Sequence, residues 1–86
     1  MSEVTVKYFA WLRERVGVPE EQITLPRADM TIADLIAHLS ERGENYAYAF
    51  ADQTIVRAAI DQMHADHADP IEDAREIALF PPMTGG

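Results

Sequence analysis

The 86 residues suffice for one domain with one hydrophobic core, because a chain of this size buries only about 60–65% of its unfolded surface on folding. The net charge is −8, and the sequence has no cluster of cations of the kind that binds a nucleic-acid backbone. It contains no cysteine, which excludes disulfides and cysteine-held metal sites within the chain. It also has no apolar run of the ~20 residues that span a membrane, and Glu3, Lys7 and Arg13 interrupt any signal peptide, so we expect a cytoplasmic protein.

A strand is predicted over residues 4–9, where apolar and polar residues alternate and β-branched and aromatic types dominate. One face of this strand would carry Val4, Val6 and Tyr8. Phe9 would point to the other face.

A short helix and a second strand are predicted next. Leu12 and Val16 lie four residues apart, and Gly17 is a typical helix stop. Residues 21–26 alternate again, and Pro26 would end that strand.

The clearest predicted helix begins at Thr31. Thr31 and Asp34 have the spacing of a capping box, with aspartate in place of the more usual Glu or Gln. An apolar stripe at i, i+3, i+4 and i+7 follows, formed by Ile32, Leu35, Ile36 and Leu39. Gly43 is expected to end this helix.

The second half of the chain is predicted to be mainly strands. Residues 46–50 alternate but contain alanine, a poor strand former, so helix and strand both fit. Strands are expected over residues 54–60 and 76–80, with a turn at 61–62 leading to a shorter strand and a loop over 66–72. One amphipathic helix covers one face of one sheet, so we predict an α+β domain with a mixed sheet curled around one main helix.

We divide the chain into a domain of residues 1–80 and a projecting tail of residues 81–86. Pro81 and Pro82 favour a stiff, extended stem. Gly85 and Gly86 follow, and glycine lacks a Cβ, so such a tip could thread a narrow channel and present its carboxylate to another enzyme. The alternative is a frayed end without function.

An apolar patch is predicted at the base of this tail. Phe9 and Phe80 are out of phase with the faces expected to be buried, so both would lie on the uncovered side of the sheet. Pro81, Pro82 and Met83 would extend the patch. Such patches on small proteins usually mark interaction sites.

The sequence gives little support for a metal site or for an independent catalytic site. His64 and His67 have H-x-x-H spacing, but Pro70 opposes the helix that would bring both rings together, so we expect no metal site. The sequence contains no nucleophile elbow and no glycine-rich phosphate loop, so we do not expect an autonomous enzyme.

Together these segments resemble the small, sulfur-carrying subunit of molybdopterin synthase, a ubiquitin-like β-grasp family. The resemblance spans nearly the whole chain. It is carried by residues 4–14, 31–39, 58–62 and 78–86, and the terminal P-P-x-x-G-G is its most specific motif.

The resemblance implies a fold and a chemistry. The first and last strands would be parallel neighbours, which would place Phe9 beside Phe80. Gly86 would be adenylated by an activating enzyme that uses ATP, and a separate sulfur donor system would convert it to a thiocarboxylate. The chain itself would bind no cofactor.

The same resemblance implies partners. The large subunit of molybdopterin synthase would hold the catalytic pocket, receive the tail within a heterotetramer, and pass sulfur to cyclic pyranopterin monophosphate. Gly85 would allow threading. The residues that would dock partners are Phe9, Phe80, Pro81, Pro82, Met83 and Thr84. Neither nucleic acid nor a membrane is an expected partner.

Two departures from the family pattern leave alternatives open. Asp61 stands where asparagine is frequent, and Ala74-Arg75 replaces the usual Gly-Asp. If that glycine has a positive φ in the family, either Ala74 is strained or the turn is rebuilt. The alternatives are a carrier for thiamine-thiazole synthesis or another sulfur pathway, a ubiquitin-like modifier, and a β-grasp interaction module without carrier chemistry.

Overall fold

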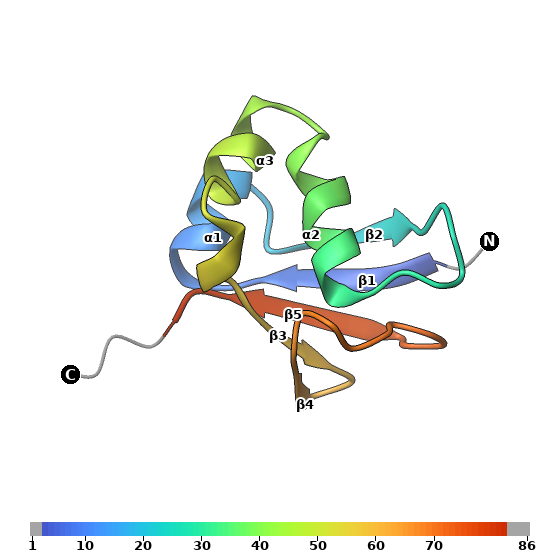
Figure 1. Cartoon of the computed structure of the whole chain (residues 1–86). Coiled ribbons are helices and arrows are strands. Elements are labelled where there is room, and N and C mark those ends of the chain that lie inside the picture. Colours follow the sequence, from blue (N-terminus) through green and yellow to red (C-terminus); the bar gives the residue numbers. More distant parts are fainter. Residues whose placement is uncertain (1–2, 83–86) are drawn as a thin grey trace.

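The computed structural model describes residues 3–82, in which one sheet is packed against three helices (Figure 1). The elements are β1 (Glu3–Tyr8), α1 (Ala10–Val16), β2 (Glu20–Thr24), α2 (Ile32–Ser40), α3 (Glu44–Ala49), the 3₁₀ helix η1 (Gln53–Ile55), β3 (Arg57–Ile60), β4 (Met63–Ala65) and β5 (Glu76–Phe80).

The five strands form one mixed sheet in the order β2-β1-β5-β3-β4. Strands β1 and β5 are parallel at its centre, with Val6 opposite Ile77 and Tyr8 opposite Leu79. The other three pairs are antiparallel. This confirms the predicted α+β class and the parallel pairing of the first and last strands.

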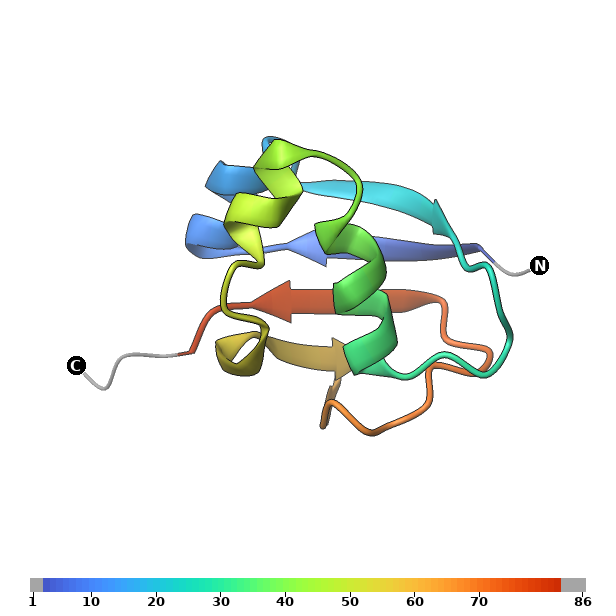
Figure 2. The same cartoon turned by 45° about the horizontal axis from the view of Figure 1, so that its top comes forward.

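Helix α2 is fixed at its N-terminus by its own sequence. The Asp34 amide donates to Thr31 Oγ1 at 3.2 Å, and the Thr31 amide donates to Asp34 Oδ2 at 3.0 Å, which confirms the capping box. The four residues of the predicted stripe are all buried. Through this stripe α2 lies across one face of the sheet (Figure 2).

The two faces of the sheet differ as the strand phase predicted. Val4, Val6, Tyr8, Ile77 and Leu79 are buried beneath the helices. The alternate residues of the same two strands point to the opposite face and are half-buried: Thr5, Lys7, Ala78 and Phe80. Within residues 3–82, all three helices lie on the first face (Figures 1 and 2).

Helices α1 and α3 cover the end of the sheet at which β1 and β5 finish (Figure 1). Helix α1 ends as predicted at Gly17, whose φ is 101° and whose amide donates to the Arg13 carbonyl. The ambiguous residues 46–50 belong mostly to helix α3. Gly43 precedes α3 as its N-cap, so the expectation that Gly43 ends α2 is wrong; α2 ends at Ser40.

The strand predicted over residues 54–60 is shorter than expected. Residues Gln53–Ile55 form a turn of 3₁₀ helix, because the Asp52 carboxylate accepts a hydrogen bond from the Thr54 amide at 3.2 Å and caps it. Strand β3 therefore begins only at Arg57.

The backbone angles in the turns around β3 and β5 show whether Ala74 has a positive φ. Asp61 and Gln62 have φ values of 48° and 74° and form a two-residue turn between β3 and β4, as predicted. Before β5 the residue with positive φ is Glu72, at 51°, and not Ala74. Of the two possibilities, strain at Ala74 therefore does not arise, because the left-handed residue lies two positions earlier.

Candidate functional site

The parallel ends of β1 and β5 bring the two predicted phenylalanines together. The Phe9 amide donates to the Leu79 carbonyl at 3.1 Å, which continues the β1–β5 register by one residue and sets Phe9 next to Phe80. Phe9 is 46% exposed and Phe80 is half-buried. On its other side Phe80 pairs with Arg57 of β3.

The stem of the tail begins directly after Phe80. Pro82 is half-buried, but Pro81 is buried. Pro81 therefore packs into the domain and does not extend the exposed patch as the sequence suggested. Met83, Thr84, Gly85 and Gly86, to which the sequence analysis gave docking and carrier roles, lie outside the described residues.

Ala10 makes the turn that leaves Phe9 exposed. Its φ is 54°, a left-handed conformation that costs a residue with a Cβ roughly 1 kcal/mol or more. Phe9 itself is extended and forms the N-cap of α1 without a side-chain cap. The chain therefore turns sharply between the Phe9 ring and the helix that follows it.

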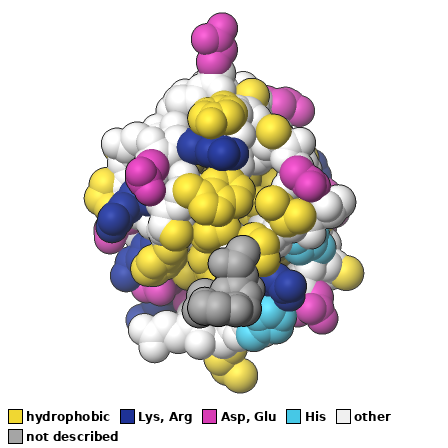
Figure 3. Space-filling view, turned by 90° about the vertical axis from the view of Figure 1, so that its left-hand side faces the viewer, with side chains coloured by type: hydrophobic (Ala, Val, Ile, Leu, Met, Phe, Trp, Pro, Cys, Tyr) yellow, Lys and Arg dark blue, Asp and Glu magenta, His cyan; other side chains and the backbone are white. Residues whose placement is uncertain are grey.

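A second cluster of side chains lies on helices α1 and α3, at the same end of the domain as Phe9. The Arg15 guanidinium carbon is 4.3 Å from the centre of the Trp11 ring and 4.1 Å from the centre of the Tyr48 ring, which joins α1 to α3. Tyr48 is 59% exposed. We call Trp11, Arg15 and Tyr48 the Arg15 cluster. Figure 3 shows hydrophobic side chains gathered on this end of the molecule, with Lys or Arg side chains among them and at their edge.

This cluster was not among the predicted site residues. The spacing of Trp11 and Arg15, four residues apart on a predicted helix, indicates that their side chains can meet. Tyr48 gave no such signal, because its approach to Arg15 depends on how α3 packs against α1.

A polar network beneath these helices ties them to the sheet. Glu21 Oε2 accepts hydrogen bonds from the hydroxyls of Tyr8 and Tyr46, both at 2.7 Å, and Glu21 Oε1 lies 3.5 Å from Arg42 Nη2. Burial raises the pKa of Tyr8, and the hydrogen bond to Glu21 raises it further. Burial and the same carboxylate raise the pKa of Tyr46. Both phenols are therefore held neutral.

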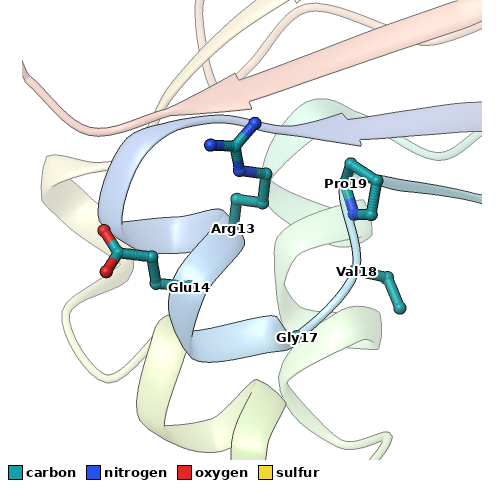
Figure 4. Close-up of a pocket in the computed structure, with 5 residues that line it drawn as sticks. All are labelled: Arg13, Glu14, Gly17, Val18 and Pro19. Carbon is teal, nitrogen blue, oxygen red and sulfur yellow. The ribbon is translucent and has the colours of Figure 1, made fainter.

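A depression of about 370 Å³ lies at the C-terminal end of α1, lined by Arg13, Glu14, Gly17, Val18 and Pro19. Figure 4 shows that its side chains diverge: Arg13 points toward the strands, while Glu14 and Val18 point away. They do not converge on a point where a ligand could be held.

The histidines are placed separately. His67 Nε2 donates to the Val56 carbonyl at 2.7 Å, since a carbonyl oxygen can only accept. His64 Nε2 lies 3.7 Å from Asp66 Oδ1. Residues 3–82 contain no group of three or more metal-ligating side chains placed to hold an ion. None of the helices formed by those residues has the length and apolar character needed to cross a membrane.

Comparison with known proteins identifies the family of this chain. The ThiS family model matches residues 6–86. The chain belongs to the ThiS family. This confirms the family resemblance, and the match includes both phenylalanines and the whole tail.

Among ThiS-family relatives, the molybdopterin synthase sulfur carrier subunit of Escherichia coli (strain K12) is 33% identical over 84 residues, which cover 96% of this chain and 99% of that one. A putative molybdopterin converting factor, subunit 1, of Pyrococcus furiosus has a TM-score of 0.76 at 28% identity, over 96% of this chain and 100% of that one.

The fold of this ThiS-family chain is shared more widely. The small archaeal modifier protein 1 of H. volcanii has a TM-score of 0.75 at 20% identity, over 96% of this chain and 100% of that one. At that identity the likeness shows the fold alone. These structures confirm the predicted β-grasp fold.

Proposed function

We propose that this chain is the sulfur carrier subunit of a molybdopterin synthase and carries sulfur as a thiocarboxylate on Gly86. The observation that carries the proposal is the similarity over nearly the full length of the curated E. coli carrier subunit. The extension of the family match to Gly86 supports it. So does the position of Phe9 and Phe80 where the chain leaves the sheet.

The proposed chemistry takes place on the terminal carboxylate. An activating enzyme would transfer AMP from ATP to the carboxylate of Gly86 and release pyrophosphate. A persulfide on a donor protein would then attack the acyl-adenylate and expel AMP, which gives an acyl disulfide between Gly86 and the donor. A thiol would reduce the S–S bond of this intermediate and release the thiocarboxylate. Gly85 and Gly86 suit this role because a backbone without Cβ atoms can approach a reaction centre closely.

The acceptor site would lie on the large synthase subunit. There the thiocarboxylate sulfur would pass to cyclic pyranopterin monophosphate, and water would return an oxygen to Gly86 and regenerate the carboxylate. We place this assembly, a heterotetramer, in the cytoplasm. Phe9, Phe80 and Pro82, together with Met83 and Thr84, would contact the large subunit.

Mass spectrometry tests the carrier chemistry directly. Incubation with the activating enzyme, ATP and a sulfur donor should replace one oxygen of Gly86 by sulfur, and a variant lacking Gly86 should show no change. The thiocarboxylated protein, mixed with the large subunit and the pterin substrate, should then form the pterin dithiolene. An unmodified Gly86 in the presence of a competent activating enzyme would overturn the proposal.

The same experiment separates the alternative functions. Modified protein that supplies sulfur only to thiazole synthesis would name a different acceptor. An isopeptide bond to lysine would indicate a modifier. An interaction module would keep its binding activity after removal of Gly85 and Gly86.

A further inference from the structure

We propose that the Arg15 cluster is a second docking point on the carrier, at which the large synthase subunit places a carboxylate beside the Arg15 guanidinium. This inference rests on the proposed function and identifies a part of the subunit contact away from the tail. Its three residues come from α1 and α3, at the end of the domain from which the tail leaves (Figures 1 and 3).

The first argument is the unmet hydrogen-bonding capacity of Arg15. A guanidinium has five N–H donors and stays charged. Arg15 is half-buried, yet within residues 3–82 no carboxylate lies within 4.0 Å of it and no hydrogen bond from its side chain is formed. In the same part of the chain, Lys7, Arg27 and Arg42 each have a carboxylate partner. Arg13, Arg57 and Arg75 have none there, but they are exposed to solvent, whereas Arg15 is half-buried. A partner's carboxylate would supply what the carrier itself does not.

The second argument is that the guanidinium is already positioned. The guanidinium carbon lies 4.3 Å and 4.1 Å from two ring centres, and these cation–π contacts hold the side chain in place without using its N–H groups in hydrogen bonds to a carboxylate. Ordering a long side chain on binding costs about 0.5–1.5 kcal/mol, and a side chain that is ordered beforehand avoids much of this cost.

The third argument is the size of the contact. A stable subunit interface buries about 800 Å² on each partner. Two phenylalanine rings supply at most roughly 500 Å², because a whole aromatic side chain buries about 150–250 Å². The tail adds area of its own, and the rest of the contact has to lie on the domain surface that adjoins Phe9 and Phe80. The Arg15 cluster begins two residues after Phe9. Tyr48 and Ile55, at 59% and 37% exposed, add apolar area at this end.

Charge reversal tests the proposal. We expect Arg15→Glu to weaken binding to the large subunit of the same organism about tenfold or more, measured by calorimetry with the full chain. Arg15→Lys, which keeps the charge but not the planar group, should lose several-fold. The matched control is Arg75→Glu, which makes the same change in charge at an exposed position. Arg75 lies directly before β5, at the end of that strand opposite to Phe80. The affinity of this control for the large subunit should change less than twofold.

Further readouts separate docking from folding and from the carrier chemistry. The thermal unfolding midpoint of Arg15→Glu checks that the variant is folded, and the affinity of the wild type should fall with salt more steeply than that of Arg15→Glu. Wild-type affinity in Arg15→Glu, or equal losses in Arg15→Glu and Arg75→Glu, would overturn the inference and leave the carrier function intact. A wild-type chain that does not bind the large subunit would overturn both. A defect confined to adenylation would assign the cluster to the activating enzyme and overturn the proposed partner.

Discussion

Ala10 is the residue at which strand β1 gives way to helix α1, and its left-handed φ of 54° allows Phe9 to stay on the surface while α1 folds back over the sheet. Glycine is the usual residue for this conformation, because it has no Cβ to clash with the neighbouring carbonyl. Functional sites often retain strained residues, and Ala10 lies at the base of the proposed docking surface.

Replacing Ala10 with glycine should therefore stabilise the protein by up to about 1 kcal/mol, since relief of strain exceeds the added entropy of the unfolded chain. The control is Ala47→Gly, also at an exposed position but inside helix α3, which should destabilise the protein by about 0.5–1 kcal/mol. Urea unfolding of both variants measures the difference. Equal destabilisation by the two would show that Ala10 is not strained.

Asp61 is a second residue whose conformation and contacts act together. Its φ is 48°, and its Oδ1 accepts hydrogen bonds from the amides of Arg75 and Glu76, both at 3.0 Å. The carboxylate thus ties the β3–β4 turn to the start of β5.

Asp61→Ala should lower the free energy of unfolding by about 1–2 kcal/mol, because two amide donors lose their acceptor and alanine tolerates the positive φ poorly. Asp61→Asn should stay within about 0.5 kcal/mol of the wild type, because its side-chain oxygen can accept the same bonds and asparagine adopts this φ readily. Chemical denaturation checks both values. Losses of equal size would refute the bridging role of the side chain.

At the scale of the elements, the network around Glu21 connects sheet and helices. Tyr8 comes from β1, Glu21 from β2, Tyr46 from α3, and Arg42 from the segment between α2 and α3. The folded state holds both phenols neutral, with pKa values raised first by burial and then by hydrogen bonds to Glu21.

This network predicts a loss of stability in alkali. Unfolded tyrosine ionises near pH 10, so a folded-state pKa above that value gives stability that is complete below about pH 10 and is lost as the pH rises toward the folded-state pKa. We expect the free energy of unfolding to fall as the pH rises above about 10, and to fall less steeply in Tyr8→Phe. Circular dichroism with urea at each pH measures the slope. An equal reduction of the slope in the surface control Tyr48→Phe would contradict the assignment.

The sequence predicted those elements whose pattern is local. Alternation in β1 and β5 and the capping box at Thr31 each follow from neighbouring residues, and the structure confirms them. Helix α3 could not be decided, because Ala47 and Tyr48 fit either pattern until Ala49 and Phe50 are buried against the rest of the fold.

The candidate site was predictable to the same degree. Strand phase placed Phe9 and Phe80 on the uncovered face, and only the family resemblance made them neighbours. The position of Tyr48 against Arg15, and the burial of Pro81, depend on contacts between elements far apart in the sequence, so no local pattern indicates them.

At the scale of the whole molecule, the parallel β1–β5 pair gives the sheet two different ends, one with Phe9 and Phe80 and the other with the β3–β4 turn. Strand β1 ends at Tyr8, directly before Phe9, and β5 ends at Phe80, next to α1 and α3 (Figure 1). The β3–β4 turn lies at the opposite end, because Ile60 pairs with Ile77 at the beginning of β5. Each end has an exposed hydrophobic side chain, Phe9 at 46% and Met63 at 75%. Exposure alone therefore does not distinguish the proposed docking surface from the far end of the sheet; Phe9 differs from Met63 in lying at the end where β5 leads into Pro81 and Pro82.

This arrangement yields a comparison between two exposed hydrophobic residues. Phe9→Ala should weaken binding to the large synthase subunit tenfold or more, since a central aromatic side chain often supplies 2 kcal/mol or more of binding energy. Met63→Ala removes a more exposed side chain at the far end and should leave the affinity within about twofold, because residues away from the contact contribute little. Calorimetric titration of the large subunit with each variant measures both, and thermal unfolding checks that each is folded. Equal losses in the two variants, or none in Phe9→Ala, would mean that the large subunit does not dock at the tail end of the sheet.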